Sequence, residues 1–349
     1  MPKAARKLGD LLQKRTASVF RGTGRDSLAH YSSSGTCRPF DNSIDIPFLW
    51  VGIQEPFRTV SNMSSVMLGS PRQTTSWSVG LLRGKSLDSL VAASGIANPI
   101  FCEHDVKHLG GTMAADPFAI LVDGTWFLFF EMCVRDSPHA VIAAASSRDL
   151  LTWQPLGIVL DAGHHLSYPF VFEHGGGIFM MPESKKARAV TIYRAVKFPF
   201  RWEPVRTILR GKYFDASMVH HEGRWWLFAG WLSYSLRLFH ANHPLGPWRP
   251  HAWPWIRTYA PSAARPGGRP VVIDGQLIRF AQDNVARYGH RLRAWRVTHL
   301  TPRWFAEEPW SPQPLLSPSG DGWNASGMHH IDPHRTANGE WIAFVDGHP

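Results

Sequence analysis

Carboxyl groups are the most chemically suggestive side chains in this sequence. Asp116, Glu183 and Asp215 each lie near one end of a short, apolar and aromatic-rich segment, in ADPFAILV, IFMMPE and FDASMVHH. Breaking or forming a glycosidic bond needs two such groups, one protonated for the leaving oxygen and one ionised to activate water or attack the sugar. We therefore take these three acids as candidate catalytic residues of a carbohydrate-active protein.

Other polar side chains in similar segments are candidates for binding a substrate. An arginine offers a planar fork that matches a phosphate or a carboxylate, so an arginine among them suggests an anionic group on the substrate. The candidates of this kind are Arg265, Tyr168, Asp283, His329 and His330.

Each acid also has a purely structural interpretation. An aspartate before proline, as at Asp116, often caps a turn. Carboxylates at strand ends, such as Glu131 and Asp346, are often satisfied by hydrogen bonds from the backbone. The choice between these interpretations depends on which elements position the acids.

A recurring hairpin indicates those elements. The segments WFLFFE, IFMMPE, WWLFAG, LIRFAQ and WIAFVD begin at intervals of roughly 50 residues, the period of a four-stranded propeller blade. Each is preceded, two residues earlier, by a glycine, which a tight hairpin turn needs because it adopts positive φ at little cost. The glycines are Gly124, Gly176, Gly223, Gly275 and Gly339. Shorter strands precede these turns, and third and outer strands follow the first four hairpins.

The fifth repeat is incomplete, because the sequence ends at Pro349 just after its second strand. The segment from Trp77 to Arg83 has the same apolar alternation and could supply the missing third strand, closing the ring and removing an open edge. We predict an all-β fold, a single five-bladed β-propeller over residues 77–349 closed by its own N-terminal strand. Two stacked β-sandwiches are the alternative. Residues 1–31 are predicted to form a basic leader, disordered or an amphipathic helix, and residues 32–76 an irregular arm.

In a propeller the inner strands surround one axis, so polar groups at equivalent positions of the repeats become neighbours. The first strands offer Asp116, Tyr168, Asp215, Arg265 and the pair His329 and His330. The sixth positions of the second strands offer Glu131, Glu183, Gly230, Gln282 and Asp346, with Asp283 adjacent. Acids, an arginine and histidines are thus expected around one axis.

These segments carry a family resemblance. The opening ADPFAILVDGTWFLFFE is similar to the first blade of the glycoside hydrolase clan that includes the family 43 arabinanases and xylosidases and the family 32 invertases. Together with SYPFVFEHGGGIFMMPES, YFDASMVHHEGRWWLFAGW, PLGPWRPH, RFAQDNVARYG and GMHHID, it resembles more closely a particular propeller domain. That domain precedes the glycosyltransferase domain of plant glucosamine inositolphosphorylceramide transferases, and bacteria carry it alone or fused to formyltransferase-like domains.

The resemblance implies roles for the acids. Asp116 matches the general base of the family 43 pattern, and Asp215 lies where a second aspartate tunes a pKa. The pattern places its acidic glutamate in a later blade, whereas here Glu183 is the available acid and blade four presents Arg265 and Asp283. The resemblance also allows a central divalent ion near a histidine of blade five, although we predict no cofactor and no metal ligands.

Two functions follow as hypotheses. One is an enzyme that hydrolyses or transfers a glycosyl unit on a sugar or glycolipid. The other is a noncatalytic propeller that binds a glycan or glycolipid for a partner glycosyltransferase. The sequence leaves both open.

Composition bounds the remaining possibilities. The net charge is +10, and residues 1–30 carry seven basic residues against two acidic ones. The rest of the chain is mildly basic and has no RNA- or DNA-binding motif, so nucleic acid is not an expected partner. The basic leader could bind an anionic membrane surface. The widely spaced Cys37, Cys102 and Cys133 predict no disulfide framework, and we expect a cytoplasmic protein, peripheral to the membrane if the leader binds there.

Overall fold

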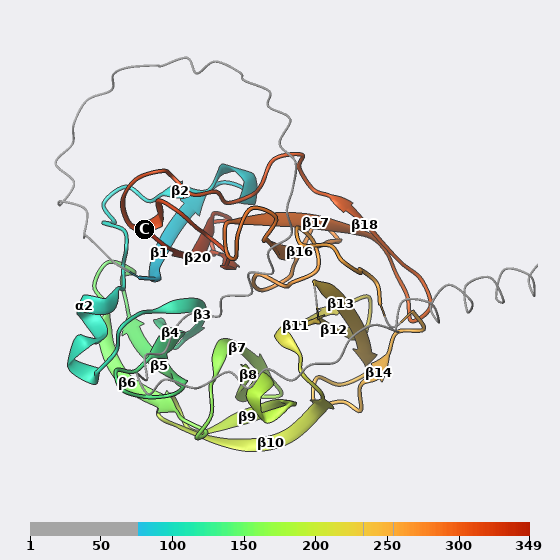
Figure 1. The fold of residues 1–349 in the computed structure, drawn as a ribbon, viewed down its shortest axis with the longest axis horizontal. Helices are drawn as coiled ribbons and strands as arrows, with labels where there is room; N and C mark the ends of the chain where they lie inside the picture. Colours follow the sequence, from blue (N-terminus) through green and yellow to red (C-terminus); the bar gives the residue numbers. More distant parts are fainter. Residues whose placement is uncertain (1–75, 233, 254) are drawn as a thin grey trace, which may run out of the picture. The chain divides into compact units, whose positions relative to one another are not determined.

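The computed structural model describes residues 76–349 except 233 and 254. The predictions for the leader and for the irregular arm up to residue 75 lie outside these described residues. Within them the strands form five four-stranded antiparallel sheets, arranged as blades around a common centre (Figure 1). The predicted five-bladed propeller is confirmed, and the sandwich alternative is wrong. None of the helices described is long and apolar enough to cross a membrane.

The first three blades follow the sequence repeats closely, and their inner strands have the predicted bounds. Blade 1 contains β3 (Ala115–Val122), β4 (Thr125–Cys133), β5 (Ala140–Ser147) and β6 (Gln154–Leu160). Blade 2 contains β7 (Ser167–His174), β8 (Gly177–Ser184), β9 (Ala189–Lys197) and β10 (Arg201–Arg210). Blade 3 contains β11 (Phe214–His221), β12 (Arg224–Trp231), β13 (Ser235–Ala241) and β14 (Arg249–Pro250). The repeat period therefore fixes both the strand boundaries and the order of the blades.

Blade 4 and blade 5 have inner strands that begin later than predicted. Blade 4 contains β15 (Val271–Ile273), β16 (Gln276–Asp283), β17 (Arg291–Leu300) and β18 (Phe305–Pro309). Pro266 and Pro270 have no N–H to donate, which explains why the ladder does not extend through this segment. In blade 5, β19 (Ile331–Arg335) begins after His329 and His330, because the N–H groups of both histidines donate to the Asp346 carboxylate instead of a strand.

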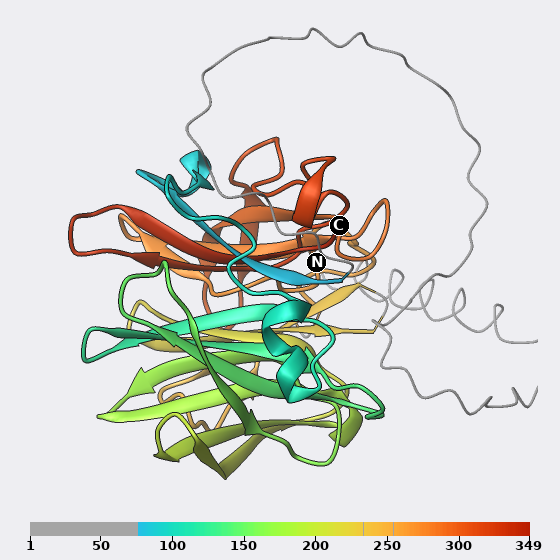
Figure 2. The same ribbon diagram turned by 90° about the vertical axis from the view of Figure 1, so that its left-hand side faces the viewer.

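The ring is closed by strands from both ends of the described chain. β1 (Ser78–Gly84) pairs antiparallel with β20 (Trp341–Gly347) along its whole length, which confirms the predicted closing strand. Figure 2 shows β1, in blue, beside the red C-terminal strand. A two-residue strand, β2 (Val91–Ala92), adds the fourth strand of blade 5, which the sequence did not predict. The short helices are α2 (Glu103–Val106), η1 (Leu87–Ser89), η2 (Lys107–Leu109), η3 (Lys185–Ala187) and η4 (Gly322–Asn324).

The hairpin glycines take the conformation expected of them. All five have φ between 70° and 86°. Large apolar side chains then fill the space between neighbouring blades: the largest cluster runs from Phe118 of blade 1 through Phe170 of blade 2 to Leu227 of blade 3. Full burial of each such side chain is worth about 1.5–3 kcal/mol. The packed blades thus provide a rigid frame for the polar groups near the axis.

Candidate functional site

The second residue of the inner strand has the same unusual backbone in three blades. Asp116, Tyr168 and Asp215 have φ of 50°, 48° and 46°, and each lies at a register shift between the first two strands of its blade. A non-glycine residue in this left-handed region costs about 1 kcal/mol or more, although aspartate tolerates it better than most. All three side chains are buried. The repeated bulge therefore gives equivalent residues a common non-strand backbone at the centre of the molecule.

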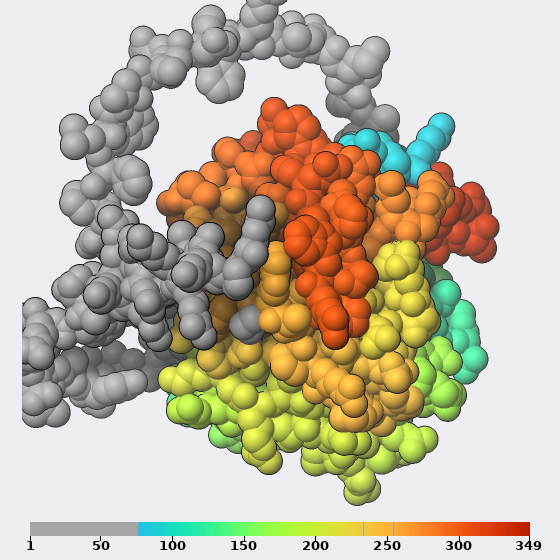
Figure 3. Space-filling model, turned by 90° about the vertical axis from the view of Figure 1, so that its right-hand side faces the viewer, coloured from blue at the N-terminus to red at the C-terminus, as the bar shows by residue number. Residues whose placement is uncertain are grey.

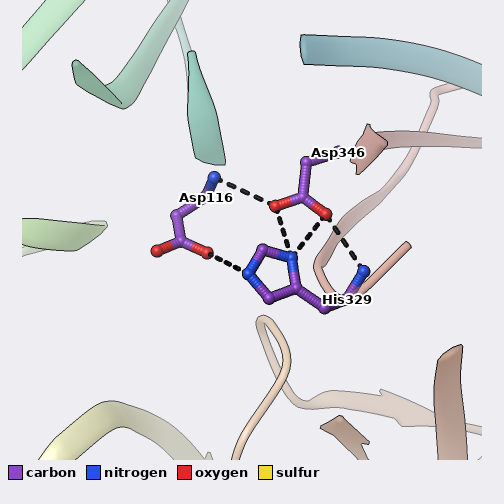
Figure 4. Close-up of side chains that lie close together, drawn as sticks. All are labelled: Asp116, His329 and Asp346. Atoms are coloured by element: carbon purple, nitrogen blue, oxygen red, sulfur yellow. Dashed lines mark hydrogen bonds and ion pairs between the residues drawn. The ribbon is translucent and has the colours of Figure 1, made fainter. Parts of the chain in front are cut away.

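Asp346, at the end of β20, organises one half of the site. Its carboxylate accepts hydrogen bonds from the backbone N–H groups of Asp116, His329 and His330 at 3.2, 3.1 and 3.0 Å. It also contacts Nδ1 of His329 at 2.8 Å (Figure 4). The imidazole lies between two carboxyl groups, since its Nε2 is 3.8 Å from Oδ1 of Asp116. The charge of Asp346 raises the pKa of His329 against the effect of burial, and His329 in turn lowers the pKa of Asp346.

Asp116 is strongly perturbed by this environment. Burial raises its pKa to about 7, partly offset by His329. Among the described residues, Oδ1 of Asp116 and Nδ1 of His330 have no hydrogen-bond partner, and they face each other at 3.7 Å. The other ring nitrogen of His330 lies 2.9 Å from the carbonyl of Pro117, so it carries the N–H that donates to this oxygen. Burial lowers the pKa of His330 to about 4.

Asp215, Arg265 and Glu183 form the other half of the site. Arg265 is ion-paired with Asp215 through Nε, and Gln282 donates to the same carboxylate at 2.9 Å. The backbone N–H of Asp215 donates to Glu183 at 3.1 Å. Burial, and next the charge of Asp215, raise the pKa of Glu183 well above its usual range. Glu183 of blade 2 therefore accepts a hydrogen bond from the backbone of Asp215 in blade 3. In the same way, Asp346 of blade 5 accepts one from the backbone of Asp116 in blade 1.

A small cavity of about 60 Å³ joins the two halves. Its lining includes four of the predicted site residues, Asp116, Glu183, Arg265 and His329, together with Trp77, Met113, Ala115, Glu131, Cys133, His165, Ser167, Lys185, Phe214 and Tyr288. The cavity therefore presents two acids whose pKa values are raised, beside cationic and aromatic groups.

Aromatic rings hold the cations of the cavity. The guanidinium of Arg265 lies 5.3 Å from the Phe214 ring centre and 5.0 Å from that of Tyr288, and Nζ of Lys185 lies 4.0 Å from Phe214. Trp77 stacks on His329 with ring centres 4.1 Å apart. Such contacts hold the charged groups in place while their polar ends remain in the cavity.

Four predicted residues do not line the cavity. The hydroxyl of Tyr168 is buried between Ser217, at 2.7 Å, and Gly268, whose N–H donates to it at 2.6 Å. Asp283 pairs with Arg293 at 2.7 Å. His330 is fully buried next to Asp116, and Asp215 is buried in its ion pair with Arg265.

Several lining residues were not among the predicted site residues. Glu131 could have been included, because it occupies the same repeat position as Glu183; it lies 3.4 Å from His165. No sequence pattern pointed to Lys185, Phe214 or Tyr288, because their position depends on how neighbouring blades meet.

A metal site would have to use Asp116, His329 and Asp346, whose ligand atoms lie within 4.8 Å of one another. Asp346 already accepts from three backbone N–H groups and contacts Nδ1 of His329. The carboxyl group of Asp116 and Nε2 of His329 are thus left to bind an ion. Two side chains fall short of the coordination shell that Zn²⁺, Ca²⁺ or Mg²⁺ requires.

Comparison with known proteins agrees with the fold. Residues 70–348 match the family described as glucosamine inositolphosphorylceramide transferase 1, N-terminal. Glucosamine inositolphosphorylceramide transferase 1 of Oryza sativa subsp. japonica is 35% identical over 298 residues, which are 78% of this chain and 40% of the relative. The Arabidopsis thaliana protein of that name is 33% identical over 93% of this chain and 45% of its own length. The chain thus spans less than half of each relative.

Solved structures share the architecture at low sequence identity. An α-L-arabinofuranosidase from Clostridium thermocellum superposes with a TM-score of 0.50 and 12% identity, over 66% of this chain and 80% of the enzyme. Identity this low supports the propeller fold alone.

Proposed function

Because this chain belongs to the glucosamine inositolphosphorylceramide transferase 1 N-terminal family, we propose that it acts on a sugar-bearing molecule, a glycan or a glycolipid head group, at the central cavity. The observation that carries the proposal is a pair of buried carboxyl groups, Asp116 and Glu183, which line one cavity and both have raised pKa values. The reaction is cleavage or transfer of a glycosyl unit.

Glu183 is the general acid of this mechanism. Its raised pKa favours the protonated carboxyl group, the form that a general acid needs. As the bond between the anomeric carbon and the leaving oxygen breaks, Glu183 transfers its proton to that oxygen and becomes a carboxylate. The nearby guanidinium of Arg265 stabilises the negative charge that remains on Glu183.

Asp116 is the general base. A pKa of about 7 leaves it partly ionised at neutral pH, which is the range in which a base is most effective. Asp116 takes the proton of the attacking water or acceptor hydroxyl while the oxygen of that group bonds to the anomeric carbon. Asp346 and His329 hold the backbone and the carboxyl group of Asp116 in place.

Trp77, Phe214 and Tyr288 give the cavity wall an aromatic character that suits the apolar faces of a sugar ring. Lys185 and Arg265 suit an anionic group next to that sugar. The substrate class favoured by this lining is a sugar that bears a phosphate or a carboxylate.

The noncatalytic alternative has one observation in its favour. Asp215 is held in an ion pair with Arg265, so neither group is fully available for chemistry, and the cavity is small. In this alternative the same lining would bind the sugar without turning it over, and the carboxyl groups would accept hydrogen bonds from its hydroxyls.

Turnover of a glycoside separates the two functions, and the dependence of the rate on the leaving group tests the role of Glu183. Wild type, Glu183→Gln and Asp116→Asn are assayed on aryl glycosides with phenols of different acidity and on sugar nucleotides. We expect Glu183→Gln to lose about 100-fold or more with poor leaving groups and much less with dinitrophenyl glycosides, which need no proton. Asp116→Asn should lose a similar factor with every leaving group. Binding without turnover in the wild type would support the noncatalytic alternative and contradict the proposal.

A further inference from the structure

One stretch of the sequence has a one-sided charge. Residues 223–273 contain six arginines and no aspartate, glutamate or lysine. Two of these arginines, Arg265 and Arg269, are ion-paired near the axis with Asp215 and Asp332. Arg249 lies on β14, the outer strand of blade 3, and Arg257 lies in the connection after it. That connection also carries the exposed Trp253 and Trp255.

The outer edges of blades 3 and 4 meet at this place. The N–H of Ala252, after β14, donates to the carbonyl of Pro302, between β17 and β18, at 3.0 Å. The rings of Trp253 and Trp304 contact each other with centres 5.1 Å apart, and each side chain is 50% exposed. Figure 3 shows the face on which the gold segment near residue 250 and the orange segment near residue 300 are adjacent.

Aromatic exposure is concentrated in this region. The exposed large aromatic side chains of the described residues are Phe200, Trp253, Trp255, Tyr259 and Trp304. All but Phe200 belong to the connection between β14 and β15 or to the connection between β17 and β18. Single exposed apolar residues are normal on a protein surface. Two exposed tryptophans in contact form a continuous apolar area in water, and such an area often marks an interaction site.

The positive charge beside these rings is uncompensated. Arg249 and Arg303 are exposed and form no ion pair with any described residue. Two nearby arginines behave differently: Arg257, in the connection between β14 and β15, pairs with Glu307 at 2.8 Å, and Arg296 of β17 pairs with Glu308 at 2.9 Å. The two acids of β18 are therefore used by these arginines, and Arg249 and Arg303 leave the charge next to the rings positive.

We propose that the surface formed by Arg249, Trp253, Arg303 and Trp304 binds the surface of an anionic lipid bilayer. Tryptophan prefers the boundary between head groups and acyl chains, because its ring is apolar and its N–H is polar. Each basic residue near an anionic leaflet adds about 1 kcal/mol. Charge favours an anionic lipid surface over a neutral glycan, which would not pair with the two arginines beside the rings. The surface is separate from the central cavity, so the proposal goes beyond the proposed function and does not depend on it.

Vesicle co-sedimentation tests the proposal on the full chain. Wild type is mixed with vesicles of phosphatidylcholine alone, and with vesicles in which a third of the lipid is phosphatidylserine. We expect binding to the anionic vesicles that falls about tenfold or more in Arg249→Glu/Arg303→Glu, because two charges are reversed. Trp253→Ala/Trp304→Ala should lose at least fivefold.

Matched controls come from blade 2. Phe200→Ala removes an equally exposed aromatic ring, and Arg206→Glu/Arg210→Glu reverses two exposed charges on β10. Both should bind like the wild type. The proposal is overturned if the wild type does not bind anionic vesicles, or binds neutral vesicles equally well. It is also overturned if the four patch substitutions leave binding unchanged, which would place the contact elsewhere in the chain.

Discussion

Replacing Asp116 with asparagine should stabilise the protein at alkaline pH and leave it unchanged at acid pH. The reason is that burial raises the pKa of Asp116 from 3.8 to about 7. Between these two values the folded state holds a proton that the unfolded state has lost. The stability that Asp116 contributes is therefore fully present below pH 3.8 and is lost as pH rises through 7.

The size of the effect follows from the shift. One pKa unit corresponds to about 1.4 kcal/mol, so a shift of about three units predicts a cost of about 4 kcal/mol for the ionised carboxylate at pH 8. Asparagine cannot ionise, has nearly the same shape, and adopts the left-handed backbone of this position as readily as aspartate. The backbone N–H of residue 116 still donates to Asp346.

Urea unfolding at pH 4.5 and pH 8 measures the difference. We expect the free energy of unfolding of Asp116→Asn to exceed that of the wild type by about 3 kcal/mol more at pH 8 than at pH 4.5, because about 1 kcal/mol of the cost is already present at pH 4.5. Asp123→Asn is the matched control, because Asp123 has a φ of 49° but lies in an exposed hairpin turn of the same blade. An Asp116→Asn variant with the same small effect at both pH values, like the control, would show that burial does not raise the pKa of Asp116.

Three further predictions concern the groups around Asp116. Arg265→Gln should cost about 3–5 kcal/mol because it leaves Asp215 buried and unpaired, and Arg265→Gln/Asp215→Asn should recover part of that loss in the same urea assay; equal losses would show that the pair is not coupled. The pKa of His330, lowered by burial to about 4, should make the protein lose about 3 kcal/mol as pH falls from 6.5 to 4, and His330→Gln should lack this part of the acid dependence. Gly268→Ala should prevent folding, judged by circular dichroism, because its Cβ would lie 1.8 Å from the carbonyl oxygen of Ile331.

The sequence predicted the blades well because a propeller repeats its local pattern. The inner strands of blades 1 to 3 and the closing pair of β1 and β20 have alternation and turn glycines that can be found by aligning the chain on itself. The prediction failed where side chains replace backbone partners, as at His329 and His330, whose N–H groups bind Asp346 rather than a strand. It also missed β2, which is two residues long and has no periodicity.

The candidate site was predictable to the extent that it uses repeat positions. Asp116 and Glu183 line the cavity because equivalent positions of different blades converge on the axis. Lys185, Phe214 and Tyr288 could not be placed in this way, because their contacts with each other and with Arg265 cross between blades. The perturbed pKa of Asp116 likewise depends on burial, which periodicity alone does not give.

Asp116 is proposed as the general base for attack on a bound sugar, and one comparison of rates tests this role. Initial rates and binding of wild type, Asp116→Asn and Asp123→Asn are measured on the glycoside or sugar nucleotide that the wild type turns over fastest. We expect Asp116→Asn to bind within about threefold of the wild type yet to turn over at least 100-fold more slowly, while Asp123→Asn matches the wild type. Turnover by Asp116→Asn at the wild-type rate would contradict the role of general base.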